Sequence, residues 1–159
     1  MLENADQEDD SDLRSKFLTF VIVGGGFSGV ETVGELNDYV RESTLNFYRK
    51  LDVNKIRVVL VSAGDGILPE LGKSLGDFAL ESLKKTGVEV LTNTKVVDAE
   101  EDYVKLSNGQ TISFGTLIWA GGIAMDPVLQ NLDCQHDDRG KIIVGDHLQI
   151  VNYKNVYAL

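Results

Sequence analysis

The chain has 159 residues, 43% of them hydrophobic, which suffices for a folded domain with a buried core. It contains no run of about 18 apolar residues, so we expect no membrane-spanning helix, and residues 1–12 lack the features of a signal peptide. Its net charge is −10 and no basic segment stands out, which argues against a nucleic-acid-binding protein.

The acidic start of the chain and its cysteine content also restrict the interpretation. Residues 1–12 contain six acids and no base, so we expect a solvated or frayed tail rather than a binding arm. A single cysteine, Cys134, cannot form an internal disulfide. A reducing compartment, and therefore a cytoplasmic location, is the natural expectation.

A glycine-rich turn between a strand and a helix is the most informative feature. Residues 18–23 form an almost continuous apolar run, typical of a strand buried on both faces of a parallel sheet. Gly24-x-Gly26-x-x-Gly29 follows, and then a segment with helical spacing. The first glycine permits a tight turn, the second lets the backbone approach a pyrophosphate, and the third allows close packing of the helix. We therefore predict a dinucleotide site rather than a purely structural turn.

The next elements complete a βαβ unit. Apolar residues recur at helical spacing from Val30 to Leu51, which predicts one long helix with a break around Ser43-Thr44 as an open alternative. Residues 52–55 form a turn, and Ile56 to Val61 is a second buried strand. A loop rich in small residues, 62–66, closes it.

The remainder of the chain alternates short helical and extended segments. An amphipathic helix spans Leu75 to Leu83, with Gly87 placed just past its end. Extended segments then follow at 88–91, 95–99, 103–106, 111–114, 116–120, 141–144 and 155–158. Asn108-Gly109 between alternating runs predicts a hairpin within an antiparallel meander. The expected fold class is α/β, a Rossmann-like central parallel sheet flanked by helices, with a small antiparallel β-meander.

This order of elements is shared with a known group of flavoproteins. The match is carried by Leu18 to Gly26, Gly29 to Glu31 with Gly34 to Leu36, Ile67 to Pro69, Gly87 to Val90, Trp119 to Gly122 with Pro127, and Asn155 to Ala158. The chain resembles the nicotinamide-nucleotide domain of flavoproteins with two dinucleotide domains, most closely that of type II, non-proton-pumping NADH:quinone oxidoreductases.

The resemblance implies a domain organisation and a set of partners. Only one Gly-x-Gly-x-x-Gly is present, so we expect an excised domain: residues 1–16 an acidic connector, and residues 17–159 the nicotinamide-dinucleotide-binding domain. FAD would be held by a flavin domain of the same parent chain, and a quinone would take the electrons. We expect no direct membrane contact by this segment, and a parent protein peripheral on the inner face of a membrane.

The resemblance also assigns roles to individual residues. Gly24, Gly26 and Gly29, with the N–H groups of Phe27 and Ser28, would hold the pyrophosphate of NADH, although Phe27 could equally be a packing residue. Ala120, Gly121 and Gly122, at the end of a later strand, would let the second face of the cofactor approach the backbone. Glu31 would be catalytic, orienting the nicotinamide or handling a proton; its simpler interpretation is an acid favoured by the helix dipole.

The end of the second strand departs from the usual NADH pattern. An acid normally accepts the ribose 2′-hydroxyl there and repels a 2′-phosphate, whereas this chain has Ser62. NADH remains the expected nucleotide, with NADPH possible; Asp65 is a substitute acid and Lys73 the nearest base in sequence. Val96 and Val97 either line the adenine or belong to the core.

Several alternatives stay open at this stage. The chain could be the NAD(P)H domain of a ferredoxin- or nitrite-reductase-type flavoprotein, a non-catalytic nucleotide-sensing module, or an S-adenosylmethionine-dependent methyltransferase. The absence of Cys-x-x-Cys argues against a low-molecular-weight thioredoxin reductase. Cys134, His136 and His147 show no metal-ligand spacing, so we predict no metal site.

Overall fold

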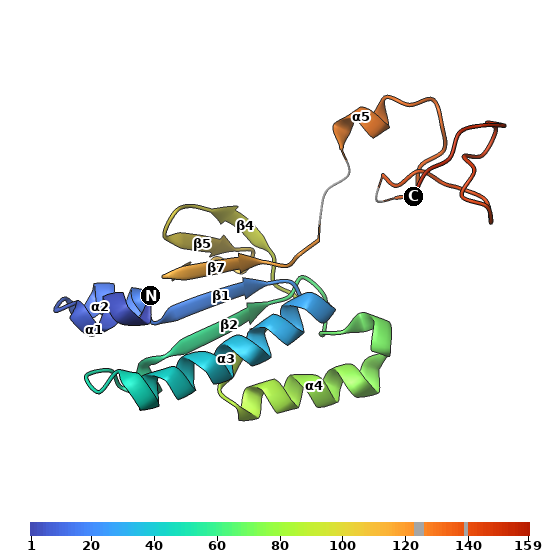
Figure 1. Ribbon diagram of the computed structural model, residues 1–159. Helices are drawn as coiled ribbons and strands as arrows, with labels where there is room; N and C mark the ends of the chain where they lie inside the picture. The colour runs from blue at the N-terminus through green and yellow to red at the C-terminus, as the bar shows by residue number, and fades with distance from the viewer. Residues whose placement is uncertain (123–125, 139) are drawn as a thin grey trace. The chain divides into compact units, whose positions relative to one another are not determined.

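A four-stranded parallel sheet organises the first part of the chain (Figure 1). The computed structural model describes residues 1–122, 126–138 and 140–159. The sheet consists of β1 (Thr19–Val23), β2 (Arg57–Val61), β3 (Val88–Leu91) and β7 (Thr116–Trp119), in the order β3-β2-β1-β7. Every pair is parallel, so the predicted Rossmann-like α/β fold is confirmed.

Both faces of the sheet are covered, which explains the continuous apolar run of β1. On one face, Phe20 and Ile22 join a cluster with Val33 of α3 (Phe27–Phe47) and Leu83 of α4 (Lys73–Lys85). In Figure 1 these two long helices lie together on one side of the sheet. All five residues of β1 are buried, because alternate side chains enter opposite cores.

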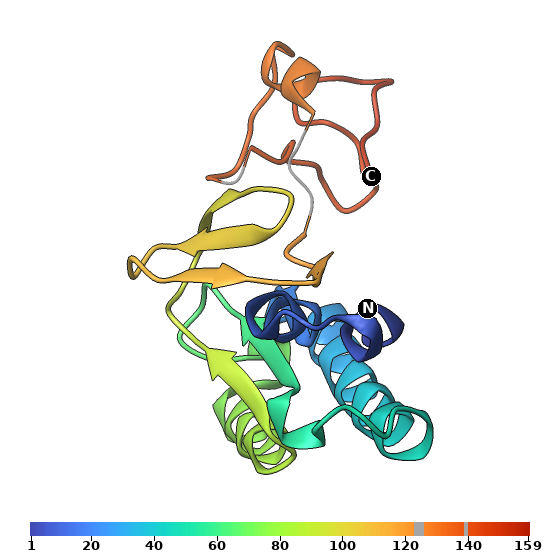
Figure 2. The same cartoon turned by 90° about the vertical axis from the view of Figure 1, so that its left-hand side faces the viewer.

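The predicted antiparallel meander covers the other face. It contains β4 (Val96–Ala99), β5 (Tyr103–Leu106) and β6 (Thr111–Ser113), in that order, and the bend between β5 and β6 has Gly109 at φ +85°. The second core cluster joins the two sheets through Val21, Val23, Val59, Val61, Val104, Leu106, Ile112 and Phe114. The small sheet and the large one therefore share one apolar layer. Figure 2 shows the backbone of this part of the chain from a second side.

The acidic start is helical, so the expectation of a frayed tail is wrong, whereas four of its six acids are exposed, as expected of a solvated segment. It forms α1 (Leu2–Gln7) and α2 (Ser11–Phe17). Leu2 and Ala5 are buried in the cluster on the helical face of the large sheet. The Asp10 carboxylate caps α2 by accepting from two backbone N–H groups, and these hydrogen bonds lower its pKa. Two apolar anchors and one cap thus order a segment whose composition suggests disorder.

The first long helix is continuous through the position where a break was considered. α3 runs unbroken to Phe47, although the prediction extended it to Leu51. Ser43 and Thr44 are buried within it, and the Thr44 carbonyl accepts from the N–H of Tyr48 at the helix end. Short 3-10 turns, η1 (Val53–Lys55) and η2 (Pro69–Leu71), precede β2 and α4 respectively.

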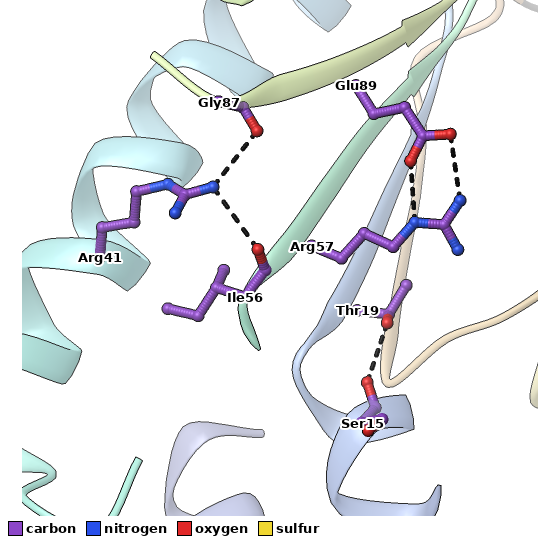
Figure 3. A network of polar contacts seen from close by, with 7 residues as sticks. All are labelled: Ser15, Thr19, Arg41, Ile56, Arg57, Gly87 and Glu89. Carbon is purple, nitrogen blue, oxygen red and sulfur yellow. Dashed lines mark hydrogen bonds and ion pairs between the residues drawn. The ribbon is translucent and has the colours of Figure 1, made fainter. Parts of the chain in front are cut away.

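An arginine on α3 ties together the loops at the amino ends of two strands (Figure 3). The Arg41 guanidinium donates to the carbonyls of Ile56 (3.5 Å) and Gly87 (3.2 Å), and its Nε donates to Asn37 Oδ1 (2.9 Å). Nearby, Arg57 of β2 pairs with Glu89 of β3 at 2.8 Å. These contacts lie at the amino ends of β2 and β3, so they stabilise the scaffold at the end opposite the glycine turn.

Contacts divide the chain into two compact units, Met1–Gly122 and Ile123–Leu159. The second unit contains α5 (Pro127–Gln130) and three isolated β-bridges: His136–Ile142, Val144–Ile150 and Gln149–Tyr157. Residues 141–144 and 155–158 make only these single bridges, so the two strands predicted there are wrong.

The predicted division at residues 16 and 17 stays a prediction. In the three described ranges, no helix is long and apolar enough to cross a membrane.

Candidate functional site

The residues that follow the strands meet at one edge of the large sheet. Backbone N–H groups of Gly24 and Ala120 donate to Val61 (2.9 Å) and Val23 (2.7 Å), respectively. The chain proceeds from β1 outward to β2 and β3, and returns to β7 on the other side of β1. The strand order therefore reverses between β1 and β7, and in open α/β sheets ligands bind in the crevice at such a point.

The glycine turn is packed so closely that two of its positions require glycine. Gly24 has φ +128°, and a Cβ there would overlap the carbonyl of Ala120. A Cβ on Gly29 would overlap the carbonyl of Gly24. The sequence thus brings the end of β7, the turn and the start of α3 into direct contact.

The start of α3 leaves room and hydrogen-bond donors for an anion. Gly26 is the N-cap, and no side chain within the described part of the chain caps the helix. The first helical hydrogen bond is Val30 N–H to Gly26 O (3.0 Å), which leaves the N–H groups of Phe27, Ser28 and Gly29 outside the helical pattern. A Cβ on Gly26 would meet no heavy atom within 4 Å. Free donors beside an open glycine suit a phosphate group.

Three predicted site residues on α3, Phe27, Ser28 and Glu31, are exposed. Phe27 is 46% exposed and belongs to neither core cluster, so it is not a packing residue of the core. Glu31 is exposed, and it is the fifth residue of a helix that begins at Phe27. Since the helix dipole acts mainly within the first turn, the dipole interpretation of Glu31 loses force. Its catalytic role stays a prediction.

The predicted second contact lies directly beside the glycine turn. Ala120 is half-buried against Gly24, while Gly121 and Gly122 are exposed, with Gly122 at φ +88°. Trp119 is 57% exposed, and its ring lies against Gly121, where a Cβ would sit 3.4 Å away. This indole is therefore a spectroscopic reporter within the candidate site.

Ser62 lies next to the turn, with its hydroxyl already engaged. It is 3% exposed, its Oγ donates to the carbonyl of Gly66 (2.9 Å), and a Cβ on Gly25 would overlap it. Asp65 is exposed within the same turn. Lys73, the nearest base in sequence, is paired with Asp77 on α4 at 3.1 Å.

Two further segments contact the site, although neither is among the predicted site residues. Leu68, buried at φ +51°, donates its N–H to the carbonyl of Gly25 (2.7 Å) and so fixes the glycine turn from outside. The loop after β3 bonds to the loop after β2: Asn93 N–H donates to Gly64 (2.6 Å) and Thr94 N–H to Ser62 (2.9 Å). The expected parallel order of β2 and β3 was the available signal for the second contact.

Of the three candidate metal ligands, Cys134 and His136 lie close to each other. Cys134 Sγ lies 3.7 Å from His136 Nε2, which lies 3.0 Å from the Leu129 carbonyl. Among residues 1–122, 126–138 and 140–159, no three His, Cys, Asp or Glu side chains are placed to hold a metal ion.

Comparison with known proteins gives consistent matches. A family model described as pyridine nucleotide-disulphide oxidoreductase matches residues 2–159. The chain is 37% identical over 145 residues to a probable NADH dehydrogenase of Dictyostelium discoideum, covering 91% of this chain and 32% of that protein. It is 32% identical over 165 residues to a type II NADH:quinone oxidoreductase of Mycobacterium tuberculosis, covering 99% and 36%.

A solved structure agrees with these sequence matches. The structure of NDH2 from Plasmodium falciparum in complex with NADH superposes with a TM-score of 0.71 at 29% identity, covering 81% of this chain and 27% of that one. The chain spans about a third of the length of the curated relatives it matches.

Proposed function

Because the chain belongs to the pyridine nucleotide-disulphide oxidoreductase family, we propose that it is the NADH-binding domain of a type II NADH:quinone oxidoreductase. One observation carries the proposal: the uncapped start of α3 lies beside the open Gly26, at the point where the strand order reverses. This arrangement fits the pyrophosphate of a dinucleotide in charge, hydrogen-bond donors and space.

The residues of the chain bind and orient the nucleotide. The N–H groups of Phe27 and Ser28 donate to the pyrophosphate, and Gly26 admits it close to the backbone. The exposed Gly121 and Gly122 let the nicotinamide half pass over the end of β7, and Glu31 orients the nicotinamide ring. The protein's part in such a reaction is binding and orientation.

The remaining chemistry belongs to groups outside these residues. FAD, held by the flavin domain of the parent chain, supplies the hydride acceptor, and a quinone accepts the electrons. The parent is accordingly peripheral to a membrane, because its quinone resides there. By itself the 159-residue chain binds NADH and does not turn over.

Calorimetric titration of the 159-residue chain tests the proposal. NADH and ADP-ribose should each bind at one site, and S-adenosylmethionine should give no binding heat. The chain mixed with NADH and a soluble quinone should show no oxidation of NADH above the rate without protein. A dissociation constant for NADH above about 1 mM, which is a binding free energy weaker than about −4 kcal/mol, would overturn the proposal.

A further inference from the structure

We propose that the adenosine end of this site accepts a 2′-phosphate, so that the domain binds NADPH as well as NADH, with Lys95 as the cation that meets the phosphate. The inference rests on the proposed nucleotide-binding function and adds its selectivity. In a βαβ dinucleotide site, the residue after the second strand reads the ribose 2′ position. That position lies in the loop 62–66, at the end of β2.

The first position of the loop after β2 lacks the carboxylate that would exclude a 2′-phosphate. The side chain at its first position is Ser62, which is buried and donates its hydroxyl hydrogen to Gly66. A serine hydroxyl carries no negative charge, so it would not repel a 2′-phosphate as a glutamate or aspartate would. One acid remains in the loop, the exposed Asp65, three residues further on.

A cation is placed beside this loop by the neighbouring strand. Asn93 and Thr94, at the end of β3, form backbone hydrogen bonds of 2.6 and 2.9 Å to Gly64 and Ser62. Lys95 follows directly, and it is exposed. Its ammonium forms no hydrogen bond or ion pair with any residue whose position is described, whereas the backbone of Lys95 is held through Ser107.

Lys73, the base named earlier for this role, is already paired, and two arginines bonded to neighbouring elements lie at the other end of the sheet. Lys73 pairs with Asp77 one turn further along α4. Arg41 and Arg57 are bonded at the amino ends of the strands, the edge opposite to the loop 62–66. Among the described residues, Lys95 is therefore an unpaired cation that directly follows the two residues bonded to the loop 62–66, and a charge-assisted hydrogen bond to phosphate is its natural use.

A matched pair of ligands isolates the 2′ position. ADP-ribose and 2′-phospho-ADP-ribose differ only in that phosphate, and both can be titrated into the full chain by calorimetry, beside NADH and NADPH. The two dissociation constants should agree within about tenfold for the wild type. Lys95→Met should weaken the 2′-phosphorylated ligand by about tenfold or more and leave ADP-ribose within about twofold.

Lys73→Met is the control, since it removes the same charge from an exposed lysine. It should leave unchanged the ratio of the dissociation constants of 2′-phospho-ADP-ribose and ADP-ribose. The ratio should also shift against the 2′-phosphate as salt increases. The inference is overturned if NADH and ADP-ribose bind while their 2′-phosphorylated forms bind more than about tenfold weaker, or if the two lysine variants behave alike. If none of the four ligands binds, the proposed function itself has failed.

Discussion

Substitution of Gly26 by alanine separates binding from folding at this site. Gly26 has φ −81°, which any L-residue adopts, and a Cβ there meets no heavy atom within 4 Å. The added methyl group therefore fits the folded chain. In the proposed complex it would occupy the space through which the pyrophosphate approaches the N–H groups of Phe27 and Ser28.

The expected magnitudes follow from this geometry. A hydrogen bond to a charged group contributes about 1.5 to 3 kcal/mol, so losing one phosphate contact should weaken NADH binding by about tenfold to a hundredfold. Alanine is a poorer N-cap than glycine, but it also restricts the unfolded chain. We therefore expect the free energy of unfolding to change by no more than about 1 kcal/mol.

Calorimetry with NADH and urea unfolding followed by Trp119 emission measure the two effects. Gly34→Ala is the matched control, because its Cβ is also free of contacts and it lies further along α3. That variant should gain about 0.5 to 1 kcal/mol of stability and bind NADH as the wild type does. Unchanged NADH affinity in a stably folded Gly26→Ala variant would refute the placement of the pyrophosphate.

Three other substitutions test the scaffold. Gly29→Ala should lower the free energy of unfolding by about 1 to 3 kcal/mol in urea titrations and abolish NADH binding, because its Cβ overlaps a carbonyl. Arg41→Met should cost about 2 to 4 kcal/mol, since it leaves several carbonyls unpaired, with NADH affinity of the folded variant unchanged. The hydrogen bond from Lys105 lowers the pKa of Asp98. The pair therefore stabilises the fold at pH values above the ordinary pKa of an aspartate, and this stabilisation is lost as the pH falls. Between neutral pH and about pH 3, the Asp98→Asn variant should lose less stability than the wild type.

The parallel sheet and the meander were predictable because their signals are local. Continuous apolar runs mark strands covered on both faces, as in β1, and Asn108-Gly109 marks the turn between β5 and β6. The acidic start was not predictable from composition. Its order depends on Leu2 and Ala5 finding an apolar surface that distant strands create. At residues 141–144 and 155–158, extended segments alone were insufficient, because a strand also needs a partner of matching length.

The candidate site likewise has one part that the sequence predicts and one part that depends on contacts between distant segments. The glycine turn could be placed from its own sequence, because a strand, three spaced glycines and a helix fix its geometry. The contact of Leu68 and the role proposed for Lys95 depend on which loops lie side by side at the carboxyl edge of the sheet. Leu68 approaches Gly25 through one backbone hydrogen bond, and Lys95 follows two residues that bond to the loop 62–66. No local pattern reports such contacts.

Backbone amide chemical shifts of the ¹⁵N-labelled chain, recorded during an NADH titration, test the central claim most directly. The proposed site predicts the largest shift changes at Phe27, Ser28 and Gly29, with further changes at Gly121 and Gly122. Residues of the second unit, such as 145–154, should be unaffected. Shift changes concentrated there, or a saturable interaction that leaves the start of α3 unchanged, would contradict the account.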